Sequence, residues 1–226
     1  MNSSANRRPL LSLVGVAASL LLLCGRVYGD GQAASLPDPI DDEPAARASA
    51  QRSAVFAGGC FWGVQAVFQH VQGVVSATSG YAGGSANTAE YEMVSTGTTG
   101  HAESVKVVYD PAKITYGRLL KIYFAVAHDP TQIDRQGPDT GARYRSEIFT
   151  VSAEQQRIAE AYIVQLDAAH VYPRRIATKV AALPAFYPAE DYHQNFAALH
   201  PYYPYIYIND RPKVEHLKQQ FPDLYK

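Results

Sequence analysis

The chain has 226 residues, of which 47% are hydrophobic, so it can bury one sizeable core and a single domain is the default expectation. It carries 20 basic and 21 acidic residues. This balance lacks the basic excess that nucleic-acid binding requires, so nucleic acid is not an expected partner. No glycine-rich phosphate loop of the dinucleotide-binding or P-loop type occurs either.

Residues 1–29 predict a secretory signal peptide. Arg7 and Arg8 precede an apolar run over residues 10–23, and residues 27–29 offer a cleavage site. The apolar run is shorter than the roughly 20 residues that a membrane span needs. We therefore expect cleavage and export to the periplasm or beyond, with a membrane anchor as the less favoured alternative.

Removal of the signal changes the charge and the cysteine count. It leaves 17 basic against 21 acidic residues, a net charge of −4. Cys24 leaves with the signal, so Cys60 becomes the sole cysteine. A lone thiol in an exported domain cannot form an internal disulfide.

The remaining chain divides into a linker and a folded part. Residues 30–52, rich in Ala, Pro and acids, predict a flexible linker. Hydrophobic periodicity and cap residues then predict strands and helices in alternation over residues 53–226. The expected strands are 53–56, 74–81, 103–109, 144–151 and 176–183, and the expected helices are 60–73, 115–127, 152–169 and 188–199. This alternation predicts an α+β fold, a two-layer sandwich with helices packed on a mixed sheet.

Residues 57–68, A-G-G-C-F-W-G-V-Q-A-V-F, place a cysteine at a strand-to-helix turn. Gly58 and Gly59 permit a tight turn, because a residue without a Cβ tolerates positive φ. Cys60 then falls at the helix N-terminus, where free N–H groups and the positive dipole end stabilise an anion. We expect this position to lower the thiol pKa below its usual value of about 8.5 and to make Cys60 a nucleophile.

A purely structural role for Cys60 is the alternative, since many lone cysteines are small buried hydrophobes. Phe61 and Trp62, the only tryptophan of the chain, follow at once. Close packing does not call for two large rings at the mouth of a helix, whereas an apolar substrate does. The two rings therefore favour the reactive interpretation.

Four segments in the same order resemble the A-type peptide methionine sulfoxide reductases. They are G-C-F-W at 59–62, T-G-T-T-G-H-A-E at 96–103, G-P-D-T-G-A-R-Y-R-S at 137–146 and F-Y-P-A-E-D-Y-H-Q-N-F at 186–196. The resemblance covers residues 53–226 and implies one catalytic domain with a ferredoxin-like core. It also implies a cofactor-free, thiol-dependent reduction of methionine-S-sulfoxide, free or in proteins, as a repair of oxidative damage.

The resemblance assigns roles to residues at the matching positions. It implies Cys60 as the nucleophile, Glu103 as the acid that protonates the departing oxygen, Tyr91 and Tyr144 as donors to that oxygen, and Asp139 as a carboxylate near the site. A carboxyl acts as an acid near neutral pH only where apolar surroundings raise its pKa. The thiol and the carboxyl are then expected to share one proton as a coupled pair.

The same resemblance implies a substrate pocket. Phe61 and Trp62 would wall the methyl group of the substrate, and His193 and Asp191 would line the rim. Phe196 stands where many members of the family carry Tyr. Gln65 stands where Glu is frequent, a change for which the sequence offers no explanation.

Resolving cysteines, which many members of the family carry, are missing. Ser95 and Ile206 stand where such thiols are expected. A sulfenic acid on Cys60 therefore requires an external thiol, which would be thioredoxin, a glutaredoxin-like protein or glutathione. We expect the domain to act as a monomer.

Two other interpretations remain open from the residues alone. Cys60 would serve an acyl-transfer enzyme if His101 or His193 acted as its base. The aromatic residues would instead serve a non-enzymatic module that binds apolar peptides. Metal binding by the histidines is not expected, since H-x-x-x-H and C-x-x-C spacings are absent.

Overall fold

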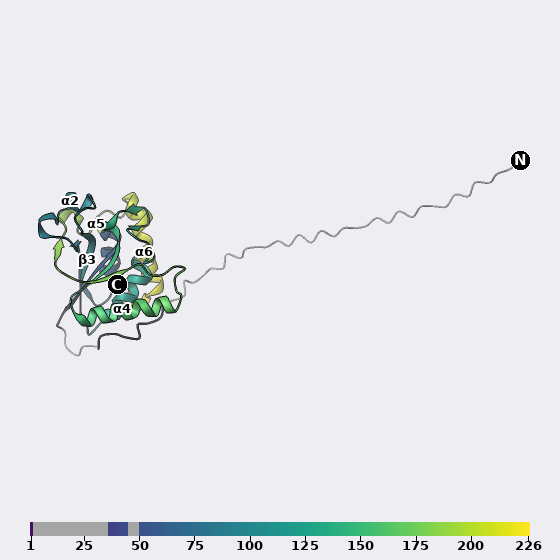
Figure 1. Ribbon diagram of the computed structural model, residues 1–226, viewed down its shortest axis with the longest axis horizontal. Coiled ribbons are helices and arrows are strands. Elements are labelled where there is room, and N and C mark those ends of the chain that lie inside the picture. The colour runs from purple at the N-terminus through teal and green to yellow at the C-terminus, as the bar shows by residue number, and fades with distance from the viewer. Residues whose placement is uncertain (2–35, 45–49) are drawn as a thin grey trace. The chain divides into compact units, whose positions relative to one another are not determined.

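The computed structural model describes residue 1 and residues 36–44 and 50–226 (Figure 1). The predicted signal peptide, apart from Met1, lies outside the described residues. Within the described part of the chain, no helix has the length and apolar character needed to cross a membrane.

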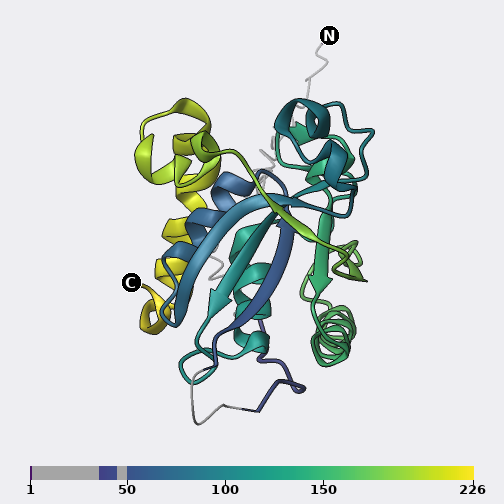
Figure 2. The same cartoon turned by 90° about the vertical axis from the view of Figure 1, so that its left-hand side faces the viewer.

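A six-stranded sheet runs through the domain (Figure 2). Its strands lie in the order β7-β6-β1-β3-β2-β8. All neighbours are antiparallel except β6 and β7, so the sheet is mixed as predicted. The bounds are β1 Arg52–Gly58, β2 Val74–Ala82, β3 Ala102–Tyr109, β6 Ser146–Thr150, β7 Lys179–Ala182 and β8 Phe186–Pro188. A separate small hairpin pairs β4 Arg135–Gln136 with β5 Asp139–Thr140.

The helices complete a ferredoxin-like core. The chain order β1-α1-β2-β3-α3-β6, with the four strands arranged as β6-β1-β3-β2, is the split βαβ arrangement of that fold. The predicted α+β class and ferredoxin-like core are therefore confirmed. The helices are α1 Phe61–Gln69, α2 Tyr91–Ser95, α3 Tyr116–Ile122 with the π-helical turn Tyr123–Ala127, α4 Ala153–Ala168, α5 Phe196–Leu199 and α6 Arg211–Gln220.

The main core lies between the sheet and the helices. Along β1 the side chains alternate between the two faces, so Phe56 points to the helices. Its ring stacks on Phe68 of α1 at 5.1 Å and on Tyr123 at 5.0 Å between centroids. A small cluster around Val55 and Phe149 forms on the opposite face. The β1-to-α1 turn thus lies next to a layer of stacked aromatic rings between the sheet and the helices.

Residues 36–44 are fixed on the domain, although the composition predicts a flexible linker over 30–52. The Glu43 carboxylate is buried, accepts hydrogen bonds from the Tyr116 N–H at 2.9 Å and the Tyr109 hydroxyl at 3.2 Å, and pairs with Arg52. Asp42 accepts from the Gly117 N–H at 2.7 Å. These carboxylates satisfy the free N–H groups at the start of α3, which composition alone does not reveal.

The structure corrects the expected helix over 188–199. Pro188 ends β8, which pairs with β2 at the sheet edge, where a residue without an N–H is tolerated. A 3₁₀ turn over Asp191–His193 and the short helix α5 follow. The helix α6 in the aromatic C-terminal tail was not predicted. The expected strand 144–151 begins only at Ser146, because Tyr144 lies in a 3₁₀ turn.

Candidate active site

Cys60 is the residue immediately before α1, directly after the end of β1. Gly59 has a φ of +87°, and a Cβ there would come within 2.5 Å of the Gln136 side chain. A Cβ on Gly58 would lie 3.1 Å from His128. Glycine is therefore required at position 59 by backbone conformation and by space, whereas at position 58 the space is only tight. The turn holds a thiol that is only 7% exposed.

The electrostatics of the thiol differ from the prediction. Burial raises the pKa of Cys60 well above its ordinary value, and the negative charges of Glu103 and Asp210 raise it further. A hydrogen bond from the Trp62 backbone and the charge of Lys213 act in the opposite direction. The expectation of a lowered thiol pKa is therefore wrong, because loss of hydration outweighs the helix N-terminus.

Glu103, on β3, lies beside the thiol turn. Its side chain is buried, and Oε2 accepts a hydrogen bond of 3.1 Å from the backbone N–H of Phe61, the residue after Cys60. Burial raises the pKa of Glu103 to about 8, although the Phe61 hydrogen bond and the charge of Arg143 oppose this. The carboxyl is thus largely protonated at neutral pH, as an acid at this position must be.

An aromatic wall surrounds these groups. Phe61 is 1% exposed, and its ring centroid lies 5.0 Å from that of His193. Trp62 stacks face to face on Phe196 at 3.9 Å, with the edge of Tyr205 at 6.0 Å. These contacts bring α1, the 190s segment and the C-terminal segment together around Cys60, and they supply apolar surface for a small substrate group.

His193 lies at the site and has a defined tautomer. Trp62 Nε1 donates a hydrogen bond of 3.3 Å to its Nδ1, so the neutral ring carries its proton on Nε2. That Nε2 has no hydrogen-bond partner among the described residues. Burial lowers the pKa of His193, so the ring is neutral at pH 7. Tyr91 packs against it at 4.5 Å between ring centroids.

Asp191 stays a predicted rim residue, as the family pattern implies. It is exposed at the start of the 3₁₀ turn, and the described part of the chain offers its carboxylate no hydrogen bond. Its neighbour Glu190 points inward instead and accepts from the Tyr81 hydroxyl and the Tyr91 N–H, both at 2.8 Å. The turn direction, which the sequence does not reveal, decides which acid faces the site.

Tyr144 and Asp139 are placed near Glu103. The Tyr144 hydroxyl accepts a hydrogen bond of 3.1 Å from Arg143, whose guanidinium lies 4.6 Å above the Tyr144 ring. Burial raises the pKa of Tyr144, and the nearby charge of Glu103 adds to this. Asp139 accepts a hydrogen bond from the Tyr205 hydroxyl, which ties the β4–β5 hairpin to the C-terminal segment.

Several residues of the site were not predicted. Gln65 holds the segment after His193 against α1, because its Nε2 donates to Gln194 Oε1 at 3.0 Å and its Oε1 accepts from the Asn195 N–H at 2.8 Å. A buried amide on an apolar helix face was the available signal. Glu190 and Arg143 lie inside the quoted motifs without an assigned role. Tyr205, Asp210 and Lys213 carried no signal, because folding alone brings them here.

Thiols other than Cys60 are absent from the residues described. Ser95 ends α2 with its carbonyl accepting from Arg143, and Ile206 is buried in the C-terminal segment. Within the same residues, no group of three or more His, Cys, Asp or Glu side chains is arranged to hold a metal ion.

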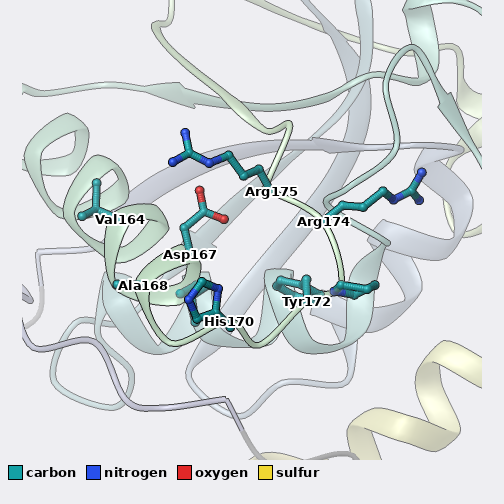
Figure 3. Close-up of a pocket in the computed structure, with 9 residues that line it drawn as sticks. Val164, Asp167, Ala168, His170, Tyr172, Arg174 and Arg175 are labelled. Carbon is teal, nitrogen blue, oxygen red and sulfur yellow. The ribbon is translucent and has the colours of Figure 1, made fainter.

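Figure 3 shows a pocket of about 530 Å³ at the C-terminal end of α4. Asp167, His170 and Arg175 line it. Asp167 is already engaged with the Ile176 N–H at 3.0 Å. None of the residues around Cys60 lines this pocket, so it is not the candidate site.

A buried thiol beside a protonated carboxyl, walled by aromatic rings, defines a thiol-based oxidoreductase site. Residues 52–225 match the model of the peptide methionine sulfoxide reductase family. The chain is 59% identical over 184 residues to peptide methionine sulfoxide reductase MsrA 2 of Mesorhizobium japonicum, covering 81% of this chain and 93% of the relative. It is 50% identical to the MsrA 2 of a Synechocystis species, covering 84% and 90%.

Solved structures give the same result. Methionine sulfoxide reductase A of Corynebacterium diphtheriae is 36% identical with a TM-score of 0.60, covering 72% of this chain and 79% of that one. Reduced Mxr1 from Saccharomyces cerevisiae is 29% identical with a TM-score of 0.63, covering 71% and 91%. The chain therefore belongs to the peptide methionine sulfoxide reductase family, of the A type, and is an oxidoreductase that acts on sulfur.

Proposed function

We propose that the chain reduces methionine-S-sulfoxide, free and in proteins, to methionine, with Cys60 as the nucleophile. One observation carries the proposal: the Phe61 N–H joins buried Glu103 to the turn that holds the thiol. This contact sets a proton donor beside a sulfur nucleophile, and sulfoxide reduction requires both groups at one centre.

In the first step, Glu103 protonates the sulfoxide oxygen. The hydroxysulfonium that results is more electrophilic at sulfur, and the Cys60 sulfur attacks while its proton passes to the Glu103 carboxylate. This attack forms an S–S bond, and the hydroxyl group then passes from the substrate sulfur to the Cys60 sulfur. The S–O and S–S bonds at the substrate sulfur break, methionine leaves, and Cys60 becomes a sulfenic acid. Glu103 gives one proton and receives one, so the raised pKa values of both groups suit this exchange.

The other site residues orient the substrate. The hydroxyls of Tyr91 and Tyr144 donate to the sulfoxide oxygen and stabilise the charge that develops there. Phe61 and Trp62 hold the methyl group, and His193 fixes Trp62 through the 3.3 Å hydrogen bond. Asp139 is a positioning residue that holds Tyr205 against the edge of Trp62. A single orientation of the methyl group makes the reaction selective for one epimer.

An external thiol completes the cycle. Its sulfur attacks the Cys60 sulfenic acid, water leaves, and a mixed disulfide forms. A second thiol then releases reduced Cys60 and an oxidised disulfide product. Thioredoxin, a glutaredoxin-like protein and glutathione each fit this role, since the described residues offer no second thiol for an internal disulfide.

The acyl-transfer alternative lacks a base. His101 Nδ1 accepts from the Gly84 N–H at 3.2 Å, and its Nε2 lies 2.9 Å from the Ser85 carbonyl oxygen. His193 Nδ1 is occupied by Trp62. Neither ring forms a hydrogen bond with Cys60 in the described structure, so no observation favours acyl transfer over sulfoxide reduction.

The test is an epimer-resolved assay. The purified domain is incubated with racemic methionine sulfoxide and dithiothreitol, and both epimers are quantified. We expect consumption of the S epimer alone and its loss in Cys60→Ser. Consumption of both epimers, or full activity in Cys60→Ser, would contradict the proposal. Unchanged peptide binding without turnover would instead indicate the binding module.

We also propose that the protein acts after export, as a monomeric repair enzyme in the periplasm or outside the cell. The sequence pattern of residues 1–29 supports export. Fractionation of cells that express the full chain, with N-terminal sequencing of the product, tests this. A product that retains residue 1 and stays in the cytoplasm would contradict it. Light scattering of the domain tests the monomer.

A further inference from the structure

A second buried carboxylate pairs with a cation next to the thiol turn. Asp210 is 1% exposed and ends the π-helical turn Ile206–Asp210 that leads into α6. Its Oδ1 accepts a hydrogen bond of 3.1 Å from Lys213 Nζ, and the Lys213 side chain is 18% exposed. Sulfoxide reduction as described above uses neither residue.

The pair reaches the first turn of α1. A Cβ on Gly63 would lie 2.1 Å from Asp210 Oδ1 and 2.8 Å from Lys213 Nζ. Gly63 follows Cys60 by three residues, and residues at this spacing are neighbours on a helix surface. Glycine at position 63 therefore leaves the space in which the carboxylate and the ammonium lie close to the thiol turn.

Fold stability does not explain this arrangement. Asp210 Oδ2 is buried and has no hydrogen-bond partner among the described residues. A buried carboxylate with an unsatisfied oxygen is costly, and an apolar residue of similar size would remove that cost. A carboxylate kept here at a cost indicates a role for its charge.

The charged groups around the sulfur come from several elements. The thiol is influenced by Glu103 on β3, Asp210 before α6 and Lys213 on α6. Of these, Lys213 alone favours the thiolate. Burial raises the pKa of Asp210, Lys213 lowers it, and Asp139 on β5 raises it. Arg143 lies near Glu103, Tyr205 near Asp210 and His128 near Lys213.

We propose that the Asp210–Lys213 pair tunes the resting protonation of the buried Cys60 thiol, with Asp210 offsetting the Lys213 ammonium so that the sulfur stays a thiol until a sulfoxide binds. Both are positioning residues that act through Cys60. The thiolate is the form that peroxide oxidises: one oxygen atom passes from peroxide to sulfur, and water is released. Repeated oxidation is irreversible, so a site without a second thiol gains from a protonated resting state. This benefit rests on the proposed function, whereas the effect on the thiol does not.

The experiment measures alkylation of Cys60 by iodoacetamide against pH in the folded domain, followed by mass spectrometry. Asp210→Asn keeps the shape and the Oδ1 acceptor but removes the charge. We expect alkylation at pH 7 to rise about tenfold, as for a pKa lowered by one unit. Oxidation by hydrogen peroxide without sulfoxide is expected to rise in parallel. Lys213→Met is expected to slow alkylation about tenfold, and Lys213→Arg to restore it.

Glu215→Gln is the matched control, because Glu215 is an exposed carboxylate on the same helix with its own cation, Arg211. Its alkylation profile is expected to equal that of the wild type. An unchanged profile in Asp210→Asn, or shifts of equal sign in Asp210→Asn and Lys213→Met, would overturn the inference. If circular dichroism shows that Asp210→Asn does not fold, the two Lys213 variants decide. Slower alkylation in Lys213→Met that is restored in Lys213→Arg then supports the inference, and unchanged alkylation in Lys213→Met overturns it. Alkylation needs no sulfoxide, so failure of the proposed reductase reaction leaves this test intact.

Discussion

The backbone N–H of Phe61 donates a hydrogen bond of 3.1 Å to the buried carboxyl of Glu103. This contact links the start of β3 to the first residue of α1 and places an acid next to the thiol turn. Glutamine at position 103 keeps an acceptor for this N–H, so Glu103→Gln changes the chemistry and retains the contact with the turn. The first two predictions follow from it.

Glu103→Gln is expected to reduce kcat/KM for methionine-S-sulfoxide by about 10²–10⁴, the usual contribution of a positioned acid. The amide still accepts from Phe61 N–H but donates no proton to the leaving oxygen. Steady-state kinetics measure the loss. Glu215→Gln is the control, because Glu215 is an exposed carboxylate on α6 that pairs with Arg211, and it is expected to keep wild-type kinetics. Equal losses in the two variants would refute the assignment of Glu103.

The pH dependence follows from the raised pKa of Glu103, about 8. The acid is protonated below that value, so kcat/KM is expected to fall as the pH rises through about 8. Measured profiles at constant ionic strength test this, since an activity that keeps rising to pH 9 would contradict it. In Glu103→Gln, the fall of kcat/KM near pH 8 should disappear.

The raised pKa of Glu103 should also make the free energy of unfolding depend on pH. The folded state holds the Glu103 proton more tightly than the unfolded chain, in which the pKa is near 4.5. Glu103 therefore destabilises the fold progressively from about pH 4.5 to pH 8. Above pH 8, Glu103→Gln is expected to be more stable than the wild type by about 5 kcal/mol, and the difference should vanish near pH 4. Urea unfolding at both pH values measures it.

Residues 36–44 supply a further prediction, concerning stability alone. Glu43→Ala leaves the Tyr116 N–H and Arg52 without their buried partner, so we expect a loss of about 2–4 kcal/mol in unfolding free energy. Asp38→Asn is the control, since Asp38 is exposed and its pairs with Arg118 and Lys121 contribute about 1 kcal/mol or less. Unchanged kcat in both variants is expected. Equal stability of both variants would show that the buried contacts contribute nothing.

The stacking of Phe196 on Trp62 yields a prediction for substrate binding. Phe196→Ala removes the ring at 3.9 Å and frees Trp62 to move, so KM for a peptide sulfoxide is expected to rise about three- to tenfold, as for the loss of an aromatic pair. Phe196→Tyr keeps the stack and is expected to keep KM. An unaltered KM in Phe196→Ala would place the peptide elsewhere.

Much of the fold was predictable because its signals are local. Thr115 and Ser152 cap α3 and α4 as expected, accepting from the N–H groups of Arg118 and Gln155. The helix α6 was missed because its apolar face is small, and only Leu217 is fully buried on it. Pro188 was misplaced because proline serves equally at a helix start and at a sheet edge.

The site was predictable where one motif carries it and not where the fold assembles it. Cys60, Phe61 and Trp62 are contiguous, and Glu103 follows from the quoted motif. The raised pKa of the thiol was not foreseen, since burial by remote segments is invisible in a strand-to-helix turn. The positions of Asp210 and Glu190 were not foreseen either, because only tertiary contacts bring Asp210 near α1 and Glu190 to the first residue of α2.

The proposed mechanism depends on Cys60 as the nucleophile, and a single-turnover reaction tests this role most directly. The enzyme is mixed with one equivalent of methionine-S-sulfoxide without reductant, and the intact protein is analysed by mass spectrometry with a sulfenic-acid trap. We predict one methionine per enzyme and a trapped adduct on Cys60 alone. Methionine formed while Cys60 remains a free thiol would contradict the mechanism.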